Sequence, residues 1–120
     1  MSVTGIVTAF NLVCSGVVMS GARDDPDMIN SKRPFQETYR VDLLKKRWCS
    51  GDCLTTQPIA KIQDTIITLQ QDDYTGVENF VAVNRENGSF VAFSRTRIFL
   101  ESRTGSCERA KFGGFPSRKF

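Results

Sequence analysis

The chain contains no histidine, and this absence excludes several kinds of chemistry at once. A protein without histidine has no Ser-His-Asp or Cys-His arrangement and no His-ligated metal. It also lacks the side chain that most often acts as a general acid or base. The chain also lacks any run near the ~20 apolar residues that a membrane-spanning helix needs. No Gly-rich phosphate-binding loop followed by Lys and Ser or Thr is present. The sequence therefore predicts a protein that is not an enzyme and uses no cofactor.

The composition is that of an ordinary globular domain. The 120 residues are 40% hydrophobic, 24% charged and 10% aromatic, which is not the composition of a disordered chain or a coiled coil. A chain of this length is expected to form one domain. Sixteen Lys and Arg residues against thirteen Asp and Glu residues give a net charge of +3, which permits contact with nucleic acid without predicting it.

Residues 5–22 are small and apolar, and they fit either a strand or an export leader. Ser20-Gly21-Ala22 resembles a signal-peptidase site, but no Lys or Arg precedes Arg23, so the positive region of a leader is missing. We therefore interpret residues 6–18 as a strand of the folded protein.

Apolar and polar residues alternate with period two in several later segments, as in half-buried strands. In residues 38–43, for example, Tyr39, Val41 and Leu43 are expected to face the core. The Asn87-Gly88 pair between two apolar runs predicts a tight hairpin, because both residue types tolerate a positive φ. Between an irregular loop at 21–34 and an irregular tail at 112–120, the expected extended segments are 38–43, 59–62, 65–69, 80–85, 89–94, 97–102 and 106–111.

These segments predict an all-β fold for residues 1–120, a single antiparallel barrel or sandwich of about six to eight short strands. A small barrel can hold one small ligand. However, the chain has nine Phe residues, and we expect side chains to fill the interior. No polar residue stands out as an anchor for a ligand.

The four cysteines are Cys14, Cys49, Cys53 and Cys107. Four cysteines permit three disulfide connectivities, a metal site or free thiols. Zinc normally uses two close pairs, and only Cys49 and Cys53 are close in sequence. The turn-forming residues 50–52 can bring these two within disulfide distance, which leaves Cys14 to pair with Cys107. We favour this disulfide-stapled arrangement over a metal site or free thiols, and it implies an oxidising compartment.

Several short segments together resemble a small group of uncharacterised, mostly alphaproteobacterial, four-cysteine β proteins. The resemblance has no assigned activity attached to it, so it implies a scaffold and assigns no functional residue. Members of the group often carry an export leader. The segments are Asn11–Gly16, Tyr39–Leu43, Arg47–Cys49 with Cys53, Ile66–Leu69, Asn84–Glu86 with Gly88, and Gly105–Cys107 with Phe112.

Two clusters of carboxylates are candidates for a cation site or an acid–base pair. Asp24, Asp25 and Asp27 form one, and Asp72 with Asp73 forms the other. Both lie in loop-like sequence, and the first lacks the glycine and the distal glutamate of an EF-hand loop. We therefore expect solvated carboxylates and no metal site.

A basic segment beside an aromatic residue makes nucleic-acid binding the alternative function. Lys45, Lys46 and Arg47 precede Trp48, and single-strand binders combine a basic groove with stacking rings on a β surface. The hairpin adds arginines and rings to this candidate surface, namely Arg85, Phe90, Phe93, Arg95 and Arg97. Both faces of the hairpin are apolar, however, which fits a buried hairpin better than an open stacking surface.

We therefore predict a small non-enzymatic binding or interaction module that is exported to the periplasm or secreted. Its partner, whether a protein or a small molecule, is not identified by the sequence. The alternative is an intracellular, cytoplasmic β-barrel that binds single-stranded nucleic acid through Lys45, Lys46, Arg47 and Trp48.

Overall fold

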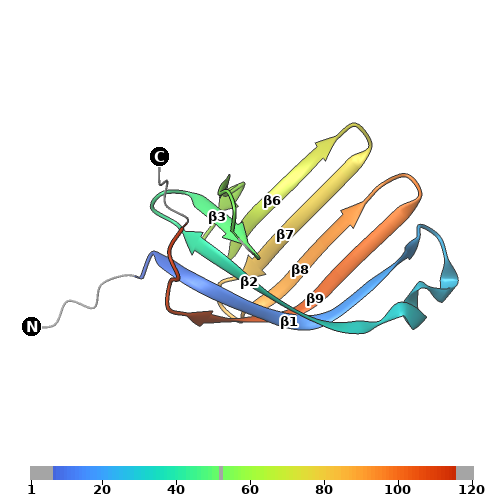
Figure 1. Ribbon diagram of the computed structural model, residues 1–120, viewed down its shortest axis with the longest axis horizontal. Coiled ribbons are helices and arrows are strands. Elements are labelled where there is room, and N and C mark those ends of the chain that lie inside the picture. Colours follow the sequence, from blue (N-terminus) through green and yellow to red (C-terminus); the bar gives the residue numbers. More distant parts are fainter. Residues whose placement is uncertain (1–6, 52, 116–120) are drawn as a thin grey trace, which may run out of the picture.

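The computed structural model describes residues 7–51 and 53–115, and these form one antiparallel sheet of nine strands (Figure 1). The all-β prediction is confirmed, but about six to eight strands was too few. Two of the strands have only two residues each, which is too short for any periodic pattern to reveal. The strands are β1 (Ala9–Ala22), β2 (Arg33–Asp42), β3 (Arg47–Ser50), β4 (Gln57–Pro58), β5 (Lys61–Ile62), β6 (Ile66–Tyr74), β7 (Val77–Asn84), β8 (Ser89–Arg95) and β9 (Phe99–Ala110).

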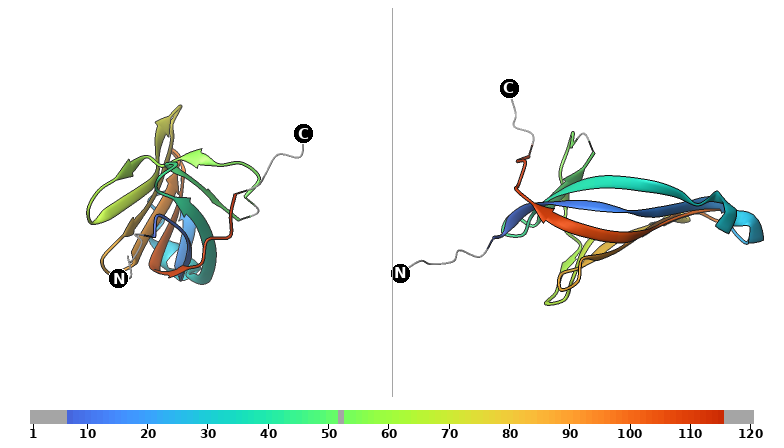
Figure 2. Two further views of the ribbon diagram at one scale, coloured as in Figure 1. Left: turned by 90° about the vertical axis from the view of Figure 1, so that its left-hand side faces the viewer. Right: turned by 90° about the horizontal axis from the view of Figure 1, so that it is seen from below.

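The sheet curls into a half-barrel, as the two views in Figure 2 show. The strand order is β4-β3-β2-β1-β9-β8-β7-β6-β5, so the first long strand pairs with the last. The outermost strands β4 and β5 belong to one short segment, which hydrogen-bonds to both edges of the curl. Within it, Ile59 N donates to the Lys46 carbonyl at 2.9 Å and Ala60 N donates to the Leu69 carbonyl at 3.2 Å. This segment therefore bridges β3 and β6 at one end of the half-barrel.

Strand β1 begins and ends later than residues 6–18, the range predicted from the sequence. Its final residues keep their ladder with β9, since Ala22 still pairs with Phe99. The expected irregular loop at 21–34 also contains regular structure, the 3-10 helix η1 (Pro26–Ser31). Asp25 caps this helix, because its side chain accepts a hydrogen bond from Asp27 N at 2.9 Å. Of the helical structure in the described residues, none is long and apolar enough to cross a membrane.

Strand β9 is continuous, although the sequence suggested two strands at 97–102 and 106–111. Gly105 lies directly opposite Gly16 of β1. A Cβ atom at Gly16 would overlap the Thr104 carbonyl oxygen, and one at Gly105 would overlap that of Ser15. The glycine that looks like a strand break thus allows two backbones to approach closely.

The predicted hairpin is present as β7 and β8, but its loop has four residues instead of two. The Asn84 side-chain oxygen accepts hydrogen bonds from Glu86 N at 2.8 Å and Asn87 N at 3.1 Å. Of the loop residues 85–88, only Gly88 has a positive φ, 77°. Asn84 thus starts the loop with its side chain, and Gly88 closes it.

One face of the curled sheet forms the core. Tyr39 and Val41 face inward as predicted, and Leu43 packs partly buried against them. The Tyr39 ring lies 5.9 Å from Trp48 and 5.6 Å from Phe90, between centroids. The buried core residues, all on alternate strand positions or on the bridging segment, are Phe10, Leu12, Cys14, Tyr39, Val41, Trp48, Ile59, Ile67, Leu69, Val81, Val83, Phe90 and Ala92.

Two disulfides are present, with the pairing that the sequence favoured. Cys14 and Cys107 are directly opposed residues of β1 and β9, separated by 93 positions in the chain. Cys49 and Cys53 close a local loop after β3. Two disulfides are compatible with an oxidising environment, because thiols in reducing compartments stay unpaired.

Candidate functional site

A pocket of about 400 Å³ opens at one end of the half-barrel. It lies where the start of β1, the β7–β8 loop and the end of β9 meet. Its apolar wall comes from Val7, Phe10, Leu12, Ile67 and Val83. Its polar rim comes from Asn84, Arg85, Glu86, Asn87 and Arg109, with Gly88 and Cys107 between the two parts. The sequence reasoning expected side chains to fill the interior, and it did not find this pocket.

Strand alternation explains why apolar and charged residues meet here. Phe10 and Leu12 face the core on β1, as does Cys14. Arg109 follows Cys107 by two positions on β9 and pairs directly with Leu12, so it lies on the same face of the sheet. Arg109 therefore stands at the rim of the pocket, beside its apolar wall.

Hydrogen bonds hold the β7–β8 loop over the pocket from both sides. On one side, Arg85 N donates to the Thr65 carbonyl at 2.7 Å, and Arg85 Nη1 donates to the Gln63 carbonyl at 3.0 Å. On the other side, Cys107 N donates to the Gly88 carbonyl at 2.7 Å. The loop is thus tied to β9 and to the turn before β6.

The electrostatics of the rim are positive. Two arginines and one glutamate line the pocket, and a neighbouring hollow adds Lys111 beside Arg109 and Val7. Within residues 7–51 and 53–115, the ion pairs are Arg95–Glu78 and Arg103–Glu101, both elsewhere. Neither pocket arginine therefore has a carboxylate partner in the described part of the chain.

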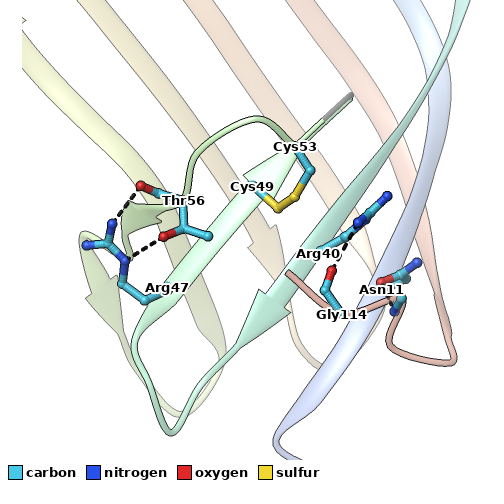
Figure 3. The surroundings of a disulfide bond; sticks show 8 residues. Asn11, Arg40, Arg47, Cys49, Cys53, Thr56 and Gly114 are labelled. Atoms are coloured by element: carbon cyan, nitrogen blue, oxygen red, sulfur yellow. Dashed lines mark hydrogen bonds between the residues drawn. A yellow bond between two sulfur atoms is a disulfide. The ribbon is translucent and has the colours of Figure 1, made fainter. Parts of the chain in front are cut away.

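The basic segment predicted for nucleic-acid binding does not form one surface. Lys45 and Lys46 are exposed in the β2–β3 turn. Arg47 instead donates from Nη2 to the Thr56 carbonyl at 2.6 Å and from Nε to the Thr56 hydroxyl at 3.0 Å (Figure 3). Trp48 is 3% exposed and packs in the core, where its indole nitrogen donates to the Pro58 carbonyl at 3.2 Å. Its ring is therefore not presented for base stacking.

The rings of the predicted hairpin surface separate onto two faces. Phe90 is buried in the core, whereas Phe80 and Phe93 lie on the outer face and stack on each other with centroids 5.4 Å apart. The guanidinium of Arg95 lies 5.4 Å from the Phe93 ring centroid and forms an ion pair with Glu78. Both outer rings thus have partners within the protein.

The acidic clusters remain separate from each other and from the pocket. Asp25 caps η1, and Asp72 accepts a hydrogen bond from Gln70 Nε2 at 2.7 Å. In the part of the chain that the structure describes, no group of three or more His, Cys, Asp or Glu side chains is arranged to hold a metal ion.

The segment after β9 folds back against the outside of the sheet. Gly113 N donates to Asn11 Oδ1 at 3.0 Å. Arg40 Nη1 donates to the Gly114 carbonyl at 3.0 Å (Figure 3). The described part of the predicted irregular tail, residues 112–115, has no regular secondary structure but is fixed by these two bonds. The rest of the predicted tail, at 116–120, lies outside the described residues.

Comparison of the chain with protein-family models, with curated proteins and with solved structures finds no match. The functional argument therefore rests on the pocket. Of its polar residues, the sequence reasoning had named Arg85 but not Arg109. The signal for Arg109 was its spacing of two residues from Cys107, which becomes informative once Cys107 is known to lie opposite the buried Cys14.

Proposed function

We propose that this protein is a small non-enzymatic binding module that takes a small molecule into the pocket at the end of its half-barrel. The observation that carries the proposal is an open pocket of about 400 Å³ with an apolar wall and a polar rim. Cavities of ~300–1,000 Å³ with this division are typical of small-molecule sites. The cysteine that lines the pocket is held in a disulfide, so it offers no thiol for catalysis.

We further propose that the module acts in the periplasm or outside the cell. The two disulfides support this location, because such bonds persist in oxidising compartments. The grouping with the alphaproteobacterial four-cysteine proteins is part of the same proposal. The support for this grouping is the set of sequence segments that contain the four cysteines. All four cysteines are in disulfides.

Binding of a neutral, apolar fluorescent probe, N-phenyl-1-naphthylamine, tests the proposal. We expect saturable binding with one site per chain, and we expect Val7→Trp to abolish it. Val7 lines the pocket but is 50% exposed, so a larger side chain there fills the opening without displacing the core. The matched control is Leu44→Trp, since Leu44 is 78% exposed in the β2–β3 turn. No binding by the wild type, or equal binding by Val7→Trp, would contradict the proposal.

Binding of single-stranded nucleic acid through Lys45, Lys46, Arg47 and Trp48 is the alternative proposal. Its support is the exposure of the two lysines at a turn of a positively charged protein. The buried Trp48 ring and the hydrogen-bonded Arg47 leave those lysines without the aromatic partner that such sites use.

A further inference from the structure

We infer that the ligand of the pocket is an anionic amphiphile, a molecule with one apolar chain and a carboxylate head, such as a fatty acid. The inference rests on the proposed function and specifies the chemistry of the ligand. It is drawn from two features of the pocket, an apolar inner wall and two arginines at the rim that form no ion pair among the described residues.

The interior of the pocket fits an apolar chain. Phe10, Leu12, Ile67 and Val83 supply its inner wall, and each belongs to the hydrophobic core. None of these four side chains carries a hydrogen-bonding group, so a polar ligand group placed against them would lose its bonds to water without replacement. The part of the ligand that contacts these four side chains must therefore be apolar.

The mouth of the pocket fits an anionic head. Arg109 lies opposite Leu12 at the end of the apolar wall, and it has no carboxylate partner among the described residues. Arg85 is oriented by its bond to the Gln63 carbonyl, which uses one of the five N–H donors of the guanidinium. Planar guanidinium groups bind carboxylates through paired, charge-assisted hydrogen bonds.

The charge balance at the mouth selects the sign of the head group. Glu86 is the one acidic residue in the pocket lining, against Arg85 and Arg109. Lys111 adds a third cation in the adjoining hollow, where Phe112 and Val7 continue the apolar surface. A cationic amphiphile would meet this excess of like charge, whereas an anionic one is attracted by it.

The experiment compares the affinities of decanoate, of decanol, which is the neutral alcohol of the same chain length, and of acetate. Each affinity is measured by displacement of the fluorescent probe, with decanoate kept below its critical micelle concentration. We expect decanoate to bind about tenfold more tightly than decanol, from one charge-assisted hydrogen-bonded contact. Acetate should not displace the probe. Affinity should rise about fourfold for each methylene between hexanoate and decanoate, because each enters an apolar environment.

Arg109→Gln should reduce the preference for decanoate over decanol, and Arg109→Lys should retain more of that preference. The matched control is Arg97→Gln, which makes the same charge change at an exposed residue after β8. Equal binding of decanoate and decanol to the wild type, or an unchanged preference in Arg109→Gln, would overturn the inference while leaving the proposed function in place. Failure of the wild type to bind the neutral probe at all would overturn both.

Discussion

At the scale of single residues, Tyr39 shows how burial couples the fold to pH. Its side chain is 3% exposed and its ring packs between Trp48 and Phe90. Burial raises the pKa of Tyr39 to about 12 from 10.0, with Glu37 adding to the rise and Arg103 opposing it. The neutral phenol is therefore the form that the folded protein accommodates.

The raised pKa predicts a loss of stability at high pH. Below pH 10 the phenol is neutral in both states, whereas between pH 10 and pH 12 only the unfolded state releases its proton. The contribution of Tyr39 is thus fully present below pH 10 and is lost as the pH rises toward 12. We expect the free energy of unfolding, measured with urea, to fall by about 2 kcal/mol over this range on account of Tyr39.

Comparison of variants isolates this contribution from other groups that titrate at high pH. Tyr39→Phe should show a shallower fall in the free energy of unfolding. Tyr74→Phe, which removes the other tyrosine at a site that is 63% exposed, should fall as steeply as the wild type. The explanation fails if all three proteins have the same pH dependence.

At the scale of elements, the two disulfides constrain very different lengths of chain. Cys14–Cys107 joins residues 93 apart, whereas Cys49–Cys53 joins residues 4 apart. In the chain-entropy account, a longer closed loop removes more freedom from the unfolded state. The first bond also lies against the core, since Cys14 is 0% exposed.

We therefore predict unequal losses when each disulfide is removed. Cys14→Ala with Cys107→Ala should lower the free energy of unfolding by about 4–5 kcal/mol, and Cys49→Ala with Cys53→Ala by about 2 kcal/mol. Thermal unfolding followed by circular dichroism should show the larger drop in Tm for the first pair. Reduction of the wild type should reproduce the sum, and an unchanged midpoint after reduction would refute the role of both bonds.

Some strands could be predicted from the sequence and others could not. The hairpin of β7 and β8 was predicted from the Asn87-Gly88 pair between two apolar runs. Alternation of apolar and polar residues was sufficient for residues 38–43, because this strand has one face in the core. Alternation was insufficient for β9, where Gly105 interrupts the pattern because the close contact with Gly16 leaves no room for a side chain. It was also insufficient for β6, where a register shift between Thr68 and Gln70 breaks the period.

The pocket could not be predicted by the same means, since its residues come from strands far apart in sequence. Alternation places Leu12 and Val83 on inward faces, but it does not say that the two strand ends meet at one mouth. That meeting depends on the pairing of β1 with β9 and on the curl of the whole sheet. Arg109 therefore looked like an ordinary surface cation in the sequence.

At the scale of the whole molecule, the positions of the aromatic residues do not favour nucleic-acid binding. Trp48 and Phe90 are in the core, and Phe80 and Phe93 stack on each other. Sequence-independent binders of single strands present ring faces along a basic groove. Among the described residues, Trp48, the ring that follows these lysines in sequence, is buried in the core.

We accordingly expect no saturable binding of single-stranded DNA or RNA oligonucleotides at low salt, as measured by fluorescence anisotropy. Lys45→Glu combined with Lys46→Glu should behave as the wild type does. Salt-sensitive binding by the wild type that the double variant loses would instead establish the alternative function.

The position of β1 in the middle of the sheet has a consequence for protein synthesis. Its neighbours are β2, which is synthesised soon after it, and β9, which is the last of the nine strands to be synthesised. A nascent chain can form its local hairpins early, but one edge of β1 has no partner until residues 99–110 emerge. During that interval a long apolar strand presents unpaired backbone groups, which favours pairing with other chains. A strand that is interior in the finished protein is thus an exposed edge in the unfinished one.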